Sequence, residues 1–90
     1  MSAVATIQKA LEHSLQPEFI EIIDESYKHA GHAGAKDGGG HFIVNIVSEQ
    51  FEGKARLARH RLVNDAAQDL FDNKTIHALS IHAKTPKEAA

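Results

Sequence analysis

Residues 41–48, His-Phe-Ile-Val-Asn-Ile-Val-Ser, restrict the possible folds of this chain more than any other segment. In an extended strand, successive side chains point to opposite faces. One face of this segment carries Phe42, Val44 and Ile46, and the other carries Ile43 and Val47. A strand with apolar residues on both faces is typical of the centre of a sheet. The rest of the chain must therefore supply the neighbouring strands.

The residues before this segment predict a helix, a strand and a loop. Residues 3–15 have apolar side chains at spacings of three and four, as an amphipathic helix requires: Val4, Ile7, Leu11 and Leu15. Gln16-Pro17 ends that helix, because the residue before a proline avoids the helical region. Residues 19–23 are short and rich in β-branched side chains, which favours a strand. Residues 27–40 hold five of the six glycines and are predicted to form a long loop.

The residues after it predict a second helical region, a third strand and a short final helix. A turn at 51–53 precedes a helix over residues 54–71, which Asn64-Asp65 could divide into two. A turn at 72–74 leads to a strand over 76–83. Thr85, Pro86 and Glu88 then have the arrangement of a capped helix start, with threonine as N-cap, proline first and glutamate third.

This order of elements predicts a two-layer α+β fold, in which helices lie on one side of a three-stranded sheet. If the strands at 41–48 and 76–83 are parallel neighbours, their connection is expected to be right-handed. Residues 1–90 are expected to form a single domain, since a chain of this length can bury only a modest core.

Composition narrows the classes of function. The net charge of -2 argues against a general polyanion binder, and no apolar run approaches the ~18 residues of a membrane span. The N-terminal residues lack the charged and apolar regions of a signal peptide. The absence of cysteine excludes disulfides and cysteine nucleophiles. We expect a cytoplasmic protein that does not enter a membrane. No phosphate-binding loop, nucleophile elbow or zinc-protease motif is present, so an enzyme is not predicted.

Seven histidines, set against no cysteine, point instead to a shared metal site. His29 and His32 lie in the glycine-rich loop, and His77 opens the third strand. Imidazole can ligate a metal near neutral pH, but any thiolate ligand must then come from a partner. By strand alternation His77 shares a side with Leu79 and Ile81, the expected core side. Surface, packing or structural roles are expected for His13, His41 and His60.

A series of short motifs, in order from about residue 4 to residue 88, resembles the BolA family. The motifs are Asp24-Glu25-Ser26, the histidine-containing loop, His41-Phe42, Phe51-Glu52-Gly53-Lys54, Arg59-His60-Arg61-Leu62-Val63, Ile76-His77-Ala78-Leu79 and Ala83-Lys84-Thr85-Pro86. Each motif is weak alone, but seven in register are strong. The resemblance implies an αββααβ fold similar to the type II KH domain.

The resemblance also implies a function and a ligand set. Family members pair with monothiol glutaredoxins, and the pair holds a bridging 2Fe-2S cluster in iron-sulfur trafficking or iron and redox sensing. The implied ligands here are His77 and a loop histidine, His29 or the competing His32, opposite a glutaredoxin cysteine and a glutathione thiol. The isolated chain is then expected to be a monomer without a cluster and to form a heterodimer with its partner. Ala89-Ala90 replaces a tryptophan that often ends the family pattern.

The alternative is a DNA-binding transcriptional regulator of stress and cell-shape genes, since some bacterial family members act in this way. Four basic residues within eight positions could contact phosphates from one helix: Lys54, Arg56, Arg59 and Arg61. On a helix, Lys54 and Arg61 would share a face. RNA binding of the KH kind is not predicted, because Gly31-His32-Ala33-Gly34 lies between two strands rather than two helices.

Overall fold

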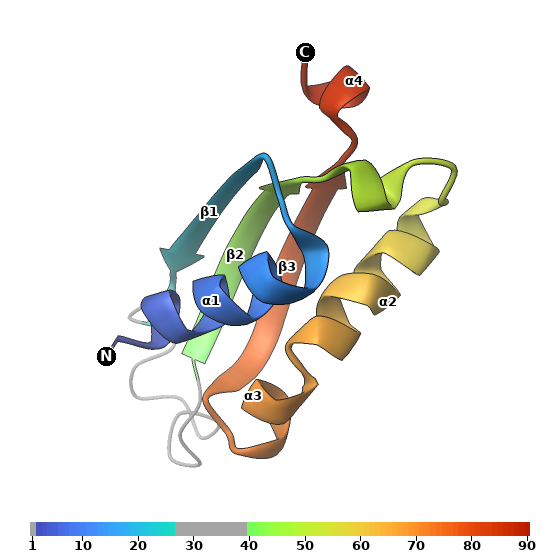
Figure 1. Ribbon diagram of the computed structural model, residues 1–90. Coiled ribbons are helices and arrows are strands. Elements are labelled where there is room, and N and C mark those ends of the chain that lie inside the picture. Colours follow the sequence, from blue (N-terminus) through green and yellow to red (C-terminus); the bar gives the residue numbers. More distant parts are fainter. Residues whose placement is uncertain (1, 27–39) are drawn as a thin grey trace.

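The computed structural model describes residues 2–26 and 40–90 and contains a sheet with helices on one side (Figure 1). His29 and His32 lie outside the described residues. The elements in chain order are α1 (Ala3–Leu15), β1 (Phe19–Asp24), β2 (Gly40–Val47), the 3-10 helix η3 (Glu49–Phe51), α2 (Arg56–Ala66), α3 (Gln68–Asp72), β3 (Ile76–Lys84) and α4 (Pro86–Ala89). The two-layer α+β fold expected from the sequence is confirmed. Among the described residues, no helix has the length and apolar character that crossing a membrane requires.

The sheet has the order β1-β2-β3, so the segment with two apolar faces is its central strand, as predicted. β1 runs antiparallel to β2, with Ile22 opposite Val44. β3 runs parallel to β2, with Val44 opposite Ile81. A parallel pair needs a long crossover, which α2 and α3 provide. β2 and β3 therefore begin at the same end of the sheet.

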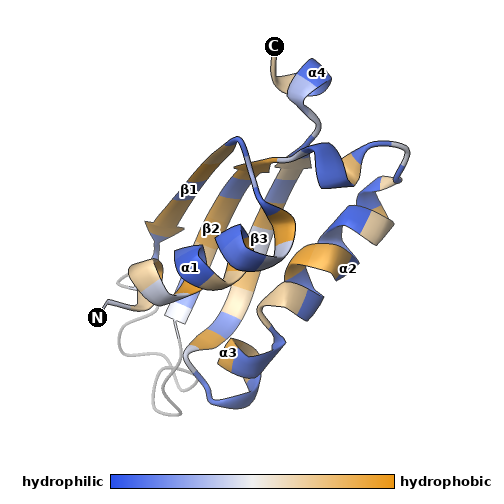
Figure 2. Ribbon diagram, in the orientation of Figure 1, coloured by the Kyte–Doolittle hydropathy of each residue, from blue (hydrophilic) through white to orange (hydrophobic). Residues whose placement is uncertain are grey.

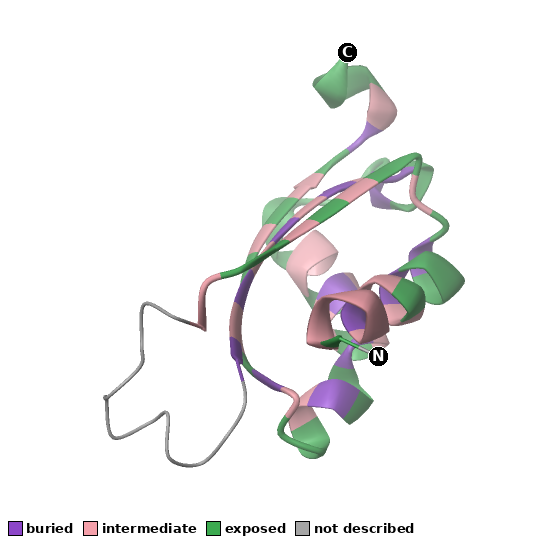
Figure 3. Cartoon of the chain, turned by 90° about the vertical axis from the view of Figure 1, so that its left-hand side faces the viewer, coloured by how far each residue is buried: buried purple, intermediate pink, exposed green. Residues whose placement is uncertain are grey.

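The core lies between the sheet and the helices α1 and α2, as the edge-on view in Figure 3 shows. Helix α1 buries Ile7, Leu11 and Leu15, three of the four residues of its predicted stripe, while Val4 is half-buried. β2 contributes Phe42, Val44 and Ile46 from one face. Helix α2 is hydrophobic on part of its surface only (Figure 2), and its Val63 is fully buried. Burial of such side chains is worth about 1.5–3 kcal/mol each relative to exposure.

The helical region after the turn differs from the prediction at its start and at its internal division. α2 begins at Arg56 rather than Lys54, because the backbone of Ala55 is extended and serves as the N-cap. The division between α2 and α3 falls at Ala67, not at Asn64-Asp65. Asn64 and Asp65 stay helical because Val63 and Ala67, four residues apart, are both buried in the core. The amide of Ala67 is shared between the carbonyls of Val63 and Asn64, at 3.1 and 3.2 Å.

The C-terminal capping box is confirmed. The amide of Glu88 donates to Thr85 Oγ1 at 3.2 Å, and the amide of Thr85 donates to Glu88 Oε1 at 2.8 Å. Pro86 occupies the first turn, where its missing N–H would have no helical acceptor. Helix α4 therefore begins directly after β3 and lies beyond the C-terminal end of that strand (Figure 1).

Candidate functional site

A β-bulge brings two histidines together where β2 and β3 begin. Gly40 pairs with Ile76, but the next residue, His41, pairs with Ala78, so His77 is an extra residue in β3. The rings of His41 and His77 have centroids 5.0 Å apart and planes inclined by 31°. A bulge bends a strand and redirects its side chains, and here it sets two imidazoles side by side at the end of the sheet.

This bulge overturns the expected placement of His77. The sequence put His77 on the core side with Leu79 and Ile81, but the structure leaves it exposed and buries Ile76 instead. The extra residue interrupts the alternation of β3 between Ile76 and Ala78. His77 is therefore available at the surface, where a partner can reach it.

His41 was not among the ligands expected from the sequence. It was expected to have a surface or packing role, yet its ring lies against that of His77. The strand order could have indicated this contact. Parallel neighbouring strands begin at the same end of a sheet, and each histidine is the second residue of its strand. His82 lies four residues beyond Ala78 along β3, roughly 13 Å at about 3.3 Å per residue, and is remote from this pair.

The ring spacing of the pair is ordinary for two packed rings, and it is also the spacing of two imidazoles that share a metal ion. With metal–nitrogen bonds of about 2.0–2.1 Å and tetrahedral angles, two imidazoles on one metal have centroids roughly 5 Å apart. The observed spacing matches that value. In the described part of the chain, no group of three or more metal-binding side chains gathers, so His41 and His77 supply at most two ligands. Because the sequence has no cysteine, a thiolate at such a site would have to come from another molecule.

The described residues on either side of 27–39 lie next to this pair. The amide of Glu25 donates to the carbonyl of His41 at 2.8 Å. The amide of His41 donates to Ser26 Oγ at 3.2 Å. Residues 26 and 40, which flank the segment, are thus joined to the same end of the sheet as His77.

Gly40 fixes the approach of β2 to this site. A Cβ at this position would lie 2.6 Å from the Cε2 and Cζ atoms of Phe42, and it would also clash with Ser26. The amide of Gly40 donates to the carbonyl of Thr75 at 3.1 Å, just before β3 begins. The glycine therefore allows the chain to pass between the Phe42 ring and Ser26 on its way to His41.

The four basic residues of the DNA hypothesis do not lie on one helical face. Arg56 and Arg61 are exposed on α2. Lys54 precedes the helix, so the expected common helical face with Arg61 does not exist. Three of the four basic residues line a groove between the start of α2 and the end of β3. The groove is lined by Lys54, Ala55, Arg56, Arg59, His60, Ile81, His82, Ala83, Lys84 and Glu88.

Arg59 joins three segments of the chain. Its Nε donates to the carbonyl of Lys54 at 2.8 Å and its Nη1 donates to the carbonyl of Ala83 at 3.1 Å. Its guanidinium also forms a two-pronged ion pair with Glu88, at 2.6 and 3.2 Å. The hydrogen bonds from Arg59 and from the amide of Thr85 lower the pKa of Glu88 to about 2. The same pairing raises the pKa of Arg59. Arg59 thus holds α4 against the rest of the fold.

Comparison with known proteins identifies relatives of the whole described fold. Residues 11–88 match the family model of the BolA-like protein. The chain is 47% identical over 87 residues to SufE-like protein 1, chloroplastic/mitochondrial, of Arabidopsis thaliana, covering 91% of this chain and 23% of that protein. It is 45% identical to the DNA-binding transcriptional regulator BolA of Vibrio cholerae, covering 91% of this chain and 74% of that protein. The solved BolA domain of SufE1 from Arabidopsis thaliana superimposes with a TM-score of 0.86 at 46% identity, covering 98% of this chain and 96% of that one.

Proposed function

The chain belongs to the BolA-like family, and from this premise we propose that it is an adaptor for a monothiol glutaredoxin with which it co-ligates a bridging 2Fe-2S cluster. The adaptor contributes imidazoles, and the partner contributes a cysteine together with a glutathione thiol. The isolated chain holds no cluster, because two imidazoles alone leave most of the iron coordination unfilled.

The observation that supports this proposal is the pair of imidazoles at the bulge, of which His77 is exposed and His41 is half-buried. Cluster iron accepts thiolate or imidazole nitrogen. His77 lies at the surface, and its ring is 5.0 Å from that of His41. A bulge that turns a histidine out of a strand beside a second histidine is the kind of local irregularity found next to functional sites.

His77 is the first ligand in this proposal, and three residues compete to be the second. The resemblance favours His29 or His32, which lie outside the described residues. The ring contact favours His41. Two imidazoles on one iron reduce the negative charge of a cluster and raise its reduction potential, as in Rieske centres. Ligation also requires neutral imidazoles, so protonation of the ligands competes with cluster binding.

The test is the visible absorption and circular dichroism of the chain mixed with a monothiol glutaredoxin, glutathione, iron and sulfide. The His77→Ala variant should lose the spectrum that is specific to the heterodimer. Separate His29→Ala, His32→Ala and His41→Ala variants identify the second ligand by the same loss. His82→Ala is the matched control, because it removes an exposed histidine from the same strand. A spectrum identical to that of glutaredoxin alone, with the unsubstituted chain present, would refute the proposal.

A second candidate function is DNA binding. It is supported by the basic groove beside α2 and by the relative from Vibrio cholerae, which is a DNA-binding transcriptional regulator. Arg56 and Arg61 are the residues to vary, because Arg59 is already bound to Glu88 and its loss would release α4. A chain of net charge -2 should bind DNA weakly and lose affinity steeply as salt increases.

The DNA hypothesis is tested by titrating the Arg56→Glu/Arg61→Glu variant with promoter DNA at several salt concentrations. Each lost phosphate contact should reduce the salt slope of the affinity by about 0.9. Lys9→Glu on α1 is the matched control, since Lys9 is exposed on a different helix. Unchanged affinity and slope in the double variant would exclude α2 as the DNA-contacting surface.

A further inference from the structure

The second face of the sheet lies opposite α1 and α2 (Figure 3), and among the described residues only the short helix α4 borders it, at one end. We call this surface the open face. Its side chains form three rows across the strands, given by the register: Phe19, Val47 and Lys84; Glu21, Asn45 and His82; Ile23, Ile43 and Ser80. Alternate residues of the same strands face the core, which the described helices α1 and α2 cover.

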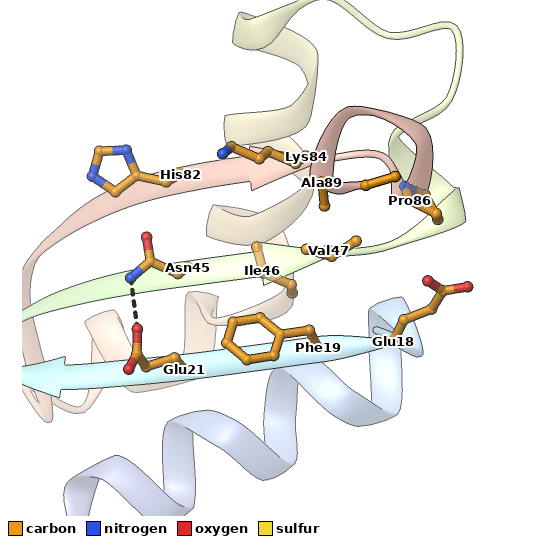
Figure 4. Close-up of a pocket in the computed structure, with 11 residues that line it drawn as sticks. Glu18, Phe19, Glu21, Asn45, Ile46, Val47, His82, Lys84, Pro86 and Ala89 are labelled. Atoms are coloured by element: carbon orange, nitrogen blue, oxygen red, sulfur yellow. Dashed lines mark hydrogen bonds between the residues drawn. The ribbon is translucent and has the colours of Figure 1, made fainter.

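The open face exposes large apolar side chains. Phe19 is 52% exposed and Ile23 is 40% exposed, and both lie on the edge strand β1. A groove runs over the row of Phe19 and ends under α4, where Pro86 and Ala89 form its wall (Figure 4). An apolar stripe within a polar rim is the usual composition of a protein interaction surface.

Charges divide the open face into two halves. Glu18 and Glu21 lie on the β1 side, whereas His82 and Lys84 lie on the β3 side (Figure 4). Asn45 lies between the halves and donates from Nδ2 to Glu21 Oε1 at 3.1 Å. The acidic and basic halves are separated by the apolar side chains of the central strand, Ile43 and Val47.

We propose that the open face docks a second copy of this chain around a two-fold axis parallel to the strands. Rotation about such an axis places β1 of one copy over β3 of the other, so Glu18 and Glu21 face Lys84 and His82 of the second copy. A two-fold axis across the strands would instead place β1 over β1 and oppose like charges. The charge distribution therefore selects one of the two arrangements in which the face can meet itself.

This arrangement also gives Phe19 an apolar environment. The side chain of Phe19 lies over the β3–α4 end of the second copy, where Pro86 and Ala89 line the groove. Sheets that pack face to face lie about 10 Å apart, with their strands within about 30° of each other. An axis parallel to the strands satisfies that angle. Because His41 lies next to Ile43 on the same face of β2, the second copy would also cover part of the histidine site.

The contact is small. Three strands about 4.8 Å apart and some seven residues long, at about 3.3 Å per residue, make a face of roughly 14 by 23 Å. Two such faces bury roughly 650 Å² in total, which is below the roughly 1,200–2,000 Å² of stable specific interfaces and is the size of a weak contact. The chain should therefore be a monomer when dilute and should associate only as its concentration rises from roughly 10 µM to roughly 1 mM. The proposal goes beyond the adaptor function, because it requires no cluster and no glutaredoxin.

The test is sedimentation equilibrium of the chain and of two charge-reversed variants over that range. The unsubstituted chain should approach twice its mass of 9.8 kDa. Glu18→Lys/Glu21→Lys makes both halves basic, and His82→Glu/Lys84→Glu makes both halves acidic. Each variant alone should dimerise at least about tenfold more weakly. Mixed in equal amounts, they should form a heterodimer, because every contact between unlike halves is restored.

Two controls keep the result interpretable. Glu12→Lys/Asp65→Lys reverses two exposed charges on the helical side and should leave association unchanged. Circular dichroism of every variant confirms that each is folded, which is expected because the substituted side chains are exposed. A chain that remains a monomer at the highest concentration would overturn the proposal. So would a dimer that both reversed variants retain, or variants that fail to associate when mixed.

Discussion

Replacing Gly40 by alanine tests how the histidine site is built. The added Cβ would lie 2.6 Å from the Cε2 and Cζ atoms of Phe42 and would also meet Ser26. Ser26 is half-buried and its side chain can rotate, at the cost of the hydrogen bond from the amide of His41. Phe42 is 3% exposed and packed in the core, so its ring has little room to move.

The sign of the change in unfolding free energy decides between a conformational and a steric effect of the new methyl group. Where the native conformation accepts an alanine without strain, replacing glycine stabilises a protein by about 0.4–1 kcal/mol, because the unfolded chain has fewer conformations. Forcing an extra carbon into a packed core costs about 1–3 kcal/mol. The contact with Phe42 is closer than real Cβ atoms adopt, so packing dominates and we expect a net loss of about 1–3 kcal/mol. In a domain of this size, each kcal/mol lowers Tm by roughly 4–8 °C.

Urea unfolding at constant m-value measures the loss, and two further variants identify its cause. Gly53→Ala is the matched control: Gly53 has a φ of 74° and a Cβ added there would have nothing within 4 Å, so its cost is conformational rather than steric, about 1–2 kcal/mol. Phe42→Leu removes the two ring atoms that the new Cβ would meet. The Gly40→Ala/Phe42→Leu variant should therefore lose less than the sum of the two single losses. A Gly40→Ala variant as stable as the unsubstituted chain, or more stable, would refute the steric argument.

Three other predictions concern stability. Ser48→Ala should cost about 1–3 kcal/mol in urea unfolding, because Ser48 Oγ donates to the buried carbonyl of Leu15 at 2.7 Å and accepts from the amide of Gln50 at 3.1 Å; a neutral result would mean that water replaces both partners. Leu11→Ala should cost about 2–5 kcal/mol by the same measurement, whereas Leu57→Ala, at 61% exposure, should stay within about 0.5 kcal/mol. The Glu88 pKa is lowered from 4.5 to about 2 by Arg59 and Thr85, so its contribution is complete above pH 4.5 and is lost as the pH falls towards 2. The Tm difference between the unsubstituted chain and Glu88→Gln should accordingly shrink across that window, and a difference independent of pH would contradict the pairing.

The candidate site shows where sequence reasoning reached its limit. His77 could be singled out because it opens a strand, but strand alternation placed it on the wrong side. Alternation assumes an unbroken ladder, and the bulge opposite Gly40 and His41 is a property of how two distant segments pair. His41 could be linked to His77 only through the parallel pairing of their strands, because 35 intervening residues separate the two histidines in the chain. Arg59 was grouped with the basic cluster, although its partners Ala83 and Glu88 come from the far end of the chain.

The sequence by itself determined the identity and order of the elements. Apolar periodicity, proline, glycine clusters and the capping box act between residues close in the chain, and they located α1, the three strands and α4 to within one or two residues. Tertiary structure alone decided the bulge, the pairing of His41 with His77, the division of the helical region at Ala67 and the attachment of α4 through Arg59. Each of these depends on which distant segments meet in the folded chain. A local sequence pattern indicates which face of a helix or strand is buried, but it does not indicate which residues of another segment will contact that face.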